Sequence, residues 1–223
     1  MIRQIKLRLS NAYLLLGEKI VIVDSGGSGE SAAILEAIRQ SGRSPDEVSL
    51  ILHTHGHSDH AGSTSELQAV LKVPAAVHAR DSDMLRNGRN RPLQPTRLSG
   101  RLLLSMVDQP FPPFSPDIEF ESGFDLQPYG VQGQALPLPG HTRGSAAVFL
   151  DDRQVIGGDV LMGGSMGGKL LPGWVRFHYF AEDRAALAES IQMLARYQPT
   201  TVHVGHGGPL QGSRVVKFAE KLR

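Results

Sequence analysis

The sequence contains no cysteine, and this absence excludes disulfide bonds and thiolate metal ligands. It has no apolar run that approaches the ~18 residues needed for a membrane-spanning helix. The charges are almost balanced, with a formal net charge of +1, so no overall field favours nucleic acid or a membrane surface. We therefore expect a small-molecule substrate and no nucleic-acid or membrane partner, and we leave a homodimer open.

We expect no secretion signal, because Met1 to Gln4 lead directly into an alternating strand pattern. This start and the missing cysteines predict a cytoplasmic protein. The 223 residues suit one large domain, and 40% hydrophobic and 20% charged residues are ordinary for a globular protein. We expect a single domain over residues 1–223.

Apolar periodicity predicts a mixed order of strands and helices. Strands are expected at 2–9, 11–16, 19–23, 48–52, 75–78, 124–126, 131–138, 146–150, 154–156 and 201–204. Helices are expected at 30–40, 63–71, 185–197 and 213–222, with a turn or helix at 81–85 and Ser213 as the N-cap of the last helix.

Residues 87–122 interrupt this order with six prolines between Pro92 and Pro116 and with four arginines. Prolines at this density oppose regular structure. A long apolar and basic insertion within a compact domain is typical of a lid or a binding loop. A helical excursion packed on the body and a dimer contact are the equal alternatives.

The densest group of ionisable side chains lies in residues 52–62, which read LHTHGHSDHAG. This segment follows the expected strand at 48–52 and supplies three imidazoles and one carboxylate within six residues: His55, His57, Asp59 and His60. Neutral imidazole and carboxylate are the usual ligands of zinc and of harder divalent metals. His55 and His57 are two residues apart and face the same way in an extended chain, and the turn after them brings the other two to a second position. The segment therefore predicts ligands for two adjacent metal ions.

Three later strand ends are each followed by a glycine and a potential metal ligand. The ligands are His141 after Gly140, Asp159 after Gly158, and His206 between Gly205 and Gly207. Loops at strand ends are where a rigid scaffold presents functional side chains, and glycine permits close backbone approach there. Each signal alone is weak, because a single Gly-His-Gly is usually a turn.

In combination, the ordered set of H-x-H-x-D-H, Gly-His, Gly-Asp and Gly-His-Gly resembles the metallo-β-lactamase superfamily. The resemblance spans residues 55–208, about two-thirds of the chain, and includes the early sequence VDSG at 23–26. It implies an α/β (α+β) fold of the four-layer αββα sandwich type, with two sheets face to face and helices outside. The expected order of strands and helices is compatible with that arrangement.

The resemblance also implies a binuclear metal centre. One metal would be held by His55, His57 and His141, a second by Asp59, His60 and His206, with Asp159 bridging both. A hydroxide shared by two cations ~3.5–4 Å apart would be the nucleophile, so no Ser or Cys nucleophile is required. Asp59 is the expected catalytic residue, because it could orient this hydroxide and move its proton. Zinc is the first expectation for both metals, with manganese and iron as alternatives.

Within the superfamily, the layout is nearest to the glyoxalase II (hydroxyacylglutathione hydrolase) branch, whose members hydrolyse acylated glutathione thioesters. Two features depart from that branch. Only fifteen residues follow Gly208, where glyoxalase II carries a C-terminal helical region for glutathione. Lys169 falls near the position of a lysine of that branch, but the accompanying tyrosine is missing. We therefore expect a metal-dependent hydrolase of a small ester, thioester or lactone.

Two other functions remain as alternatives. Persulfide dioxygenases of the same superfamily share H-x-H-x-D-H but use one iron held by two histidines and one aspartate. His206 and the other ligands of a second metal favour hydrolysis over that oxidoreductase. A degenerate, non-enzymatic scaffold is opposed by the seven filled ligand positions.

The remaining histidines and one early aspartate are not expected to bind metal directly. His53, His78 and His203 are predicted to form core contacts or hydrogen bonds rather than to bind metal. Asp24 is predicted either to orient a ligand imidazole or to cap a turn. The segment 178–180 (HYF) is predicted either to line the substrate pocket or to pack in the core.

Overall fold

The first half of the chain builds a six-stranded sheet. The structure, a computed structural model, describes residues 1–222. The strand order is β1 (Ile2–Lys6), β2 (Asn11–Leu16), β3 (Ile20–Val23), β4 (Val48–Leu52), β5 (Ala75–His78) and β6 (Ile118–Phe120). Strands β3 to β6 pair in parallel. Their carboxyl ends therefore lie at one edge of the sheet, and the predicted metal loop follows β4 at that edge.

The second half builds a second six-stranded sheet. Its order is β14 (Leu210–Gln211), β13 (Thr201–His203), β10 (Gln154–Ile156), β9 (Ala146–Leu150), β8 (Gly133–Pro137) and β7 (Phe124–Asp125). Strands β10 and β13 are parallel to each other, and both β10 and β8 are antiparallel to β9. The carboxyl ends of β8, β10 and β13 consequently share one edge, where the three later predicted ligands follow.

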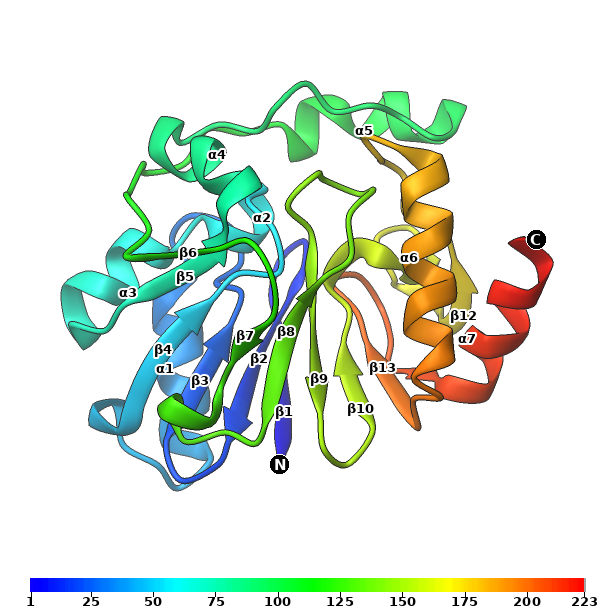
Figure 1. Cartoon of the computed structure of the whole chain (residues 1–223). Coiled ribbons are helices and arrows are strands. Elements are labelled where there is room, and N and C mark those ends of the chain that lie inside the picture. The colour runs from blue at the N-terminus through cyan, green and yellow to red at the C-terminus, as the bar shows by residue number, and fades with distance from the viewer. Residues whose placement is uncertain (223) are drawn as a thin grey trace.

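Helices cover the outer faces of both sheets (Figure 1). Helices α1 (Ser31–Gln40) and α3 (Thr64–Leu71) pack on the first sheet, and α6 (Arg184–Arg196) and α7 (Gly212–Ala219) pack on the second. The short helices α2 (Ser58–Ala61) and α4 (Ser82–Asn87) and the helix α5 (Leu98–Val107) lie at the ligand-bearing edge. The αββα sandwich implied by the family resemblance is therefore confirmed.

Both faces of the first sheet are buried, which explains the nearly continuous apolar runs of β2 and β3. Tyr13 and Leu15 point to the core between the sheets, whereas Ala12 and Leu14 point to the core beneath α1. This alternation follows from the two-residue period of a strand. Each fully buried Leu or Ile contributes about 1.5–3 kcal/mol relative to its exposed state. The two cores hold in a fixed position the edge where the predicted metal ligands follow the strands.

Most predicted elements are confirmed, with differences at a few boundaries. The strand expected at 2–9 ends at Lys6, because the amide of Leu7 donates to the carbonyl of Ser10 and turns the chain. The last helix begins at Gly212 with Gln211 as its N-cap, so the N-cap prediction for Ser213 is wrong. A hairpin of β11 (Met162–Ser165) and β12 (Leu170–Arg176) occupies a stretch where no strand or helix is predicted.

The insertion at 87–122 contains a regular helix despite its prolines. Helix α5 occupies the stretch between the two proline groups and itself contains no proline. The insertion is attached to the body, because the amide of Thr96 donates to the carbonyl of Tyr179 and Phe111 is buried. Figure 1 shows α5 lying across the edge where the two sheets meet. Within residues 1–222, no helix has the length and apolar character needed to cross a membrane.

Candidate metal centre

The first ligand loop leaves β4 and turns into α2. His57 is the N-cap of this short helix, and its carbonyl accepts the backbone amides of His60 and Ala61. The helical turn places Asp59 and His60 beyond His55 and His57, which lie in the preceding extended segment, as the sequence pattern predicts. The whole loop is buried, so every polar group on it requires a partner within the protein.

The structure brings all seven predicted ligands together. One group of donor atoms within 4.8 Å of one another consists of His55, His57 and His141, and a second consists of Asp59, His60 and His206. We call these groups the imidazole half and the carboxylate half of the centre. Asp159 lies between the halves, because its Oδ2 is 3.8 Å from His55 Nε2 in one half and 3.5 Å from His60 Nε2 in the other.

The donor set fits a pair of metal ions. Within residues 1–222, the buried atoms His55 Nε2, His60 Nε2 and Asp159 Oδ1 have no hydrogen-bond partner. An unsatisfied buried polar atom costs about 1–3 kcal/mol, and three such atoms in one cluster are stabilised together by bound cations. A Cβ at Gly205 would lie 2.1 Å from Asp159 Oδ1, so only glycine leaves room for this carboxylate. The cluster is therefore suited to a dinuclear metal site.

The carboxylate half is oriented by Asp24 and by a backbone carbonyl. Asp24 Oδ2 is 2.8 Å from His60 Nδ1, and the same carboxylate accepts hydrogen bonds from the Thr54 amide and hydroxyl. His206 Nδ1 lies 2.8 Å from the carbonyl oxygen of Leu9. Partners at Nδ1 leave each Nε2 directed at the centre. Of the two roles predicted for Asp24, the contact with His60 agrees with the first, the orientation of an imidazole of the cluster.

The imidazole half is oriented mainly by backbone contacts and by Asp81. His141 Nδ1 lies 2.9 Å from the carbonyl oxygen of Phe180. Asp81 accepts hydrogen bonds from the Gly56 amide at 3.0 Å and from the Thr142 hydroxyl at 2.6 Å, so one carboxylate connects the loops of His57 and His141. Sequence reasoning missed Asp81, although it follows the end of β5 at the same edge.

The two halves also differ in the pKa of their imidazoles. Burial lowers the pKa of His55 and His57 well below the ordinary value, and neighbouring histidines add to this effect. Burial opposes protonation of His60 and His206 as well, but nearby carboxylates, above all Asp159, outweigh it and raise the pKa of both residues. The carboxylate half is thus the more negative environment.

The other histidines of the sequence divide into two kinds. His53 Nε2 pairs with the Thr64 hydroxyl at 3.0 Å, His78 Nδ1 accepts the Arg80 amide at 3.1 Å, and His203 Nε2 pairs with Gln154 Oε1 at 3.0 Å. The prediction of hydrogen-bonding roles for these three is confirmed. His178 behaves differently, because its Nε2 lies 3.3 Å from Asp159 Oδ2. Sequence reasoning offered this residue a pocket wall or a core position, and did not place it at the metal centre.

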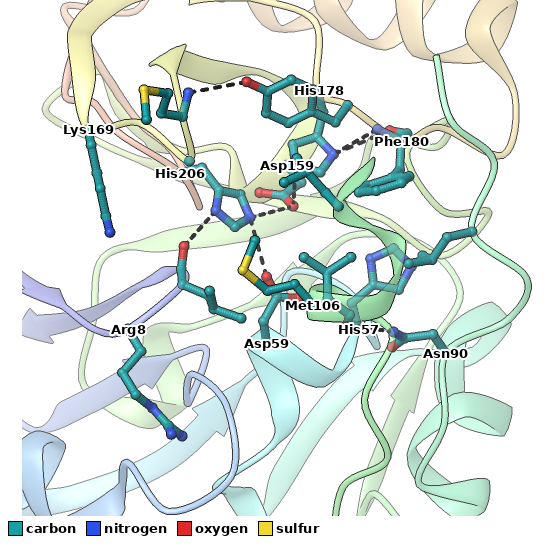
Figure 2. Close-up of a pocket in the computed structure, with 17 residues that line it drawn as sticks. Arg8, His57, Asp59, Asn90, Met106, Asp159, Lys169, His178, Phe180 and His206 are labelled. Carbon is teal, nitrogen blue, oxygen red and sulfur yellow. Dashed lines mark hydrogen bonds and ion pairs between the residues drawn. The ribbon is translucent and has the colours of Figure 1, made fainter. Parts of the chain in front are cut away.

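A cavity of about 330 Å³ opens above the centre (Figure 2). Its polar floor is formed by His57, Asp59, Asp159, His178 and His206. Apolar walls come from Leu9, Leu93, Leu103, Met106, Val107, Met166 and Phe180. Figure 2 shows Arg8 and Lys169 on one side of the cavity and Asn90 on the other. Residues of the insertion, including α5, therefore supply one wall.

Comparison with known proteins agrees with this arrangement. The sequence model of the metallo-beta-lactamase superfamily matches residues 5–206. The chain belongs to the metallo-β-lactamase superfamily. The probable metallo-hydrolase YflN of Bacillus subtilis (strain 168) is 27% identical to it over a match 237 positions long. The match covers 96% of this chain and 88% of YflN.

Solved structures of the superfamily share the fold over all or most of the chain. The B3 metallo-β-lactamase BLEG-1 superposes with a TM-score of 0.72 at 22% identity and covers 100% of this chain and 99% of its own. TTHA1623, solved in a di-iron-bound form, superposes with a TM-score of 0.66 at 30% identity and covers 92% of this chain and 91% of its own. The likeness to BLEG-1 concerns the fold alone.

The glyoxalase II branch is supported only distantly. A hydroxyacylglutathione hydrolase of Shewanella baltica (strain OS185) is 27% identical over 202 residues, which cover 90% of this chain but only 60% of that relative. Membership of the superfamily, predicted from the motifs, is confirmed. The narrower place within it stays a prediction.

Proposed function

We propose that this superfamily member is a dinuclear metal-dependent hydrolase that cleaves a small ester, thioester or lactone. The observation that carries the proposal is the pair of donor groups with Asp159 between them at the floor of one cavity. When bound, two divalent cations supply an activated water and polarise the oxygen of the scissile group. The relatives named probable metallo-hydrolases support the same class of reaction.

The chain's own residues divide the remaining tasks. His55, His57 and His141 would hold one cation, Asp59, His60 and His206 the other, and Asp159 would contact both. Asp59 also lines the cavity and lies 3.4 Å from His206 Nε2 through its Oδ2. A carboxylate in this position can accept a proton from the attacking water while it holds a cation. We therefore assign Asp59 the role of base.

The walls of the cavity support an apolar acyl or ring portion in the substrate. A volume of about 330 Å³ lies at the lower end of the range for small-molecule pockets, which is roughly 300–1,000 Å³. Leu103, Met106 and Val107 of α5 and Phe180 line the space above the floor with apolar surface. An apolar substrate portion packed there would displace water and strengthen the electrostatic contacts made at the floor. Ester, thioester and lactone groups each combine a polar carbonyl with an apolar remainder.

Zinc is our first choice for the bound metals, with manganese and iron as alternatives. All seven donors are nitrogen or oxygen atoms, and such sets accept several divalent metals according to availability. The di-iron form of TTHA1623 shows that a related protein binds iron. A homodimer and a cytoplasmic location remain part of the proposal.

The test is a metal analysis and a substrate panel on the same sample. We expect close to two metals per chain, with turnover of chromogenic esters, thioesters or lactones that chelation abolishes. The panel includes a phosphodiester and a cephalosporin as competing substrate classes. The variant His203→Phe is the control, because His203 pairs with Gln154 away from the centre. One iron per chain with oxygen uptake on glutathione persulfide would replace the hydrolase by the oxidoreductase.

A further inference from the structure

His178 is a buried imidazole at the metal centre that the seven predicted ligands do not include. It follows β12 and is 6% exposed. Figure 2 shows it beside Asp159 and Phe180 at the floor of the cavity. A buried imidazole needs a partner for each ring nitrogen.

The Nε2 atom of His178 approaches the shared carboxylate as closely as the predicted ligands do. Its distance to Asp159 Oδ2 is 3.3 Å, compared with 3.2 Å for His206 Nε2 and 3.5 Å for His141 Nε2. Donor atoms of His141, Asp159 and His178 all lie within 4.8 Å of one another. These three residues therefore form a further ligand group that shares two members with the predicted set.

The other ring nitrogen of His178 is oriented by the same carbonyl that orients His141. The Phe180 carbonyl oxygen lies 3.3 Å from His178 Nδ1 and 2.9 Å from His141 Nδ1. A backbone carbonyl that accepts the Nδ1 proton leaves the Nε2 lone pair free for a metal. In the other tautomer the Phe180 amide donates to His178 Nδ1 at 3.3 Å, and Nε2 donates to Asp159. A cation at Nε2 selects the first tautomer.

We propose that His178 is an additional metal-binding residue, whose Nε2 binds the cation of the imidazole half together with His141 and Asp159. This inference rests on the metal centre of the proposed function. It raises the number of donor side chains from seven to eight, with five of them around one cation. Four donors suffice for a tetrahedral zinc site, so the additional nitrogen favours metals that accept five or six ligands.

The test compares His178→Phe with His203→Phe. Both changes replace an imidazole by a phenyl ring, but only the first removes a nitrogen from the centre. We expect His178→Phe to weaken binding of one Co²⁺ ion about 10–100-fold and to shift its visible absorption towards a lower coordination number, whereas His203→Phe leaves both unchanged. The variant His178→Glu restores a donor of similar reach, and we expect it to recover much of the affinity.

Unfolding measurements on the metal-free variants separate a binding defect from a folding defect. If His178→Phe does not fold, the Co²⁺ titration of His178→Gln tests the inference in its place. Unchanged Co²⁺ affinity and spectrum in a folded variant would overturn the inference and leave the proposed function intact. Two bound metals with no turnover on any ester, thioester or lactone would instead overturn the proposed function alone.

Discussion

The imidazole half and the carboxylate half of the centre contain similar numbers of donors but differ in charge. The imidazole half consists of three histidines, and it adjoins the other half where His55, His60 and Asp159 lie within 4.8 Å of one another. The carboxylate half includes Asp59, and Asp24 lies directly behind His60. The buried Asp81 behind the imidazole half is paired with Arg91, so the uncompensated negative charge is concentrated on the side of Asp59 and Asp24.

This difference indicates a division of labour between the halves. The neutral histidines would leave the positive charge of a bound cation largely uncompensated, which would favour polarisation of a substrate oxygen. The carboxylate half would hold a cation more firmly, and it contains Asp59, the proposed base. The supports differ accordingly: Asp24 orients the carboxylate half, and Asp81 connects the loops of the imidazole half.

Removal of one ligand from each half is the strongest test of this comparison. We expect His57→Ala and His206→Ala each to retain one metal per chain and to lose about a thousandfold or more in kcat/KM, because each loses one of two charges that stabilise the transition state. Metal content and turnover on the best panel substrate measure this. Full turnover by His57→Ala would remove the proposed mechanism, and circular dichroism verifies that each variant is folded.

Neutralising Asp24 should affect the carboxylate half alone. Asp24→Asn removes the negative charge behind His60 Nδ1, and we expect the affinity for one metal to fall about 10–100-fold while the other metal stays bound. Stepwise removal of metal by a chelator resolves the two affinities. Asp46→Asn is the matched control, because Asp46 is exposed and belongs to none of the donor groups of the centre. Equal weakening of both metals would contradict the separation of the halves.

Each of the seven predicted ligands follows an expected strand, and parallel pairing sends the strand ends within each sheet to one edge. The local patterns therefore single out the residues, but the family resemblance of the combined motifs was needed to predict that they form one centre. His178 could not be placed in this way. The hairpin that returns it to Asp159 is built from the glycine-rich sequence MGGSMGGK, whose weak strand pattern reads as a loop.

Two other features depended on tertiary contacts that sequence patterns do not encode. Asp81 receives its partners from segments 25 and 61 residues away, at Gly56 and Thr142. Helix α5 was obscured by the prolines on either side of it, which oppose a helix at 92–95 and 110–116 but not between them. Local composition predicts neither hydrogen-bond partners that are distant in sequence nor a short helix that lies between two groups of prolines.

Neutralising Asp81 should affect the imidazole half alone, and less strongly than loss of a ligand. Asp81→Asn leaves Arg91 without its buried carboxylate partner, and we expect a loss of about 2–3 kcal/mol in the free energy of unfolding. The loops of His57 and His141 become less well held, so we expect one metal to bind about tenfold more weakly. Urea unfolding and chelator titration measure the two effects. Selective loss from the carboxylate half would contradict the assignment of Asp81.

The smallest expected effect concerns Glu182, which supports the imidazole half. Its carboxylate accepts a hydrogen bond from Arg91 Nε at 2.7 Å, and its amide donates to the carbonyl of His141 at 3.0 Å. Burial alone would raise the pKa of Glu182, but the Arg91 guanidinium outweighs it and lowers the pKa below the ordinary value. A lowered carboxyl pKa stabilises the folded protein above the ordinary pKa, and this contribution is lost as the pH falls through the folded-state pKa.

Glu182→Gln should therefore destabilise the metal-free protein by about 1–2 kcal/mol near neutral pH, and by progressively less as the pH falls below about 4.5. Urea unfolding of variant and parent at several pH values measures the difference. Glu36→Gln, at an exposed position of α1, controls for the loss of a surface charge. A difference independent of pH would mean that Glu182 acts through packing. Glu182 contacts the centre only through the loop of His141, so the variant should leave metal binding in the carboxylate half unchanged. Weaker binding there would show that the two halves are not supported independently.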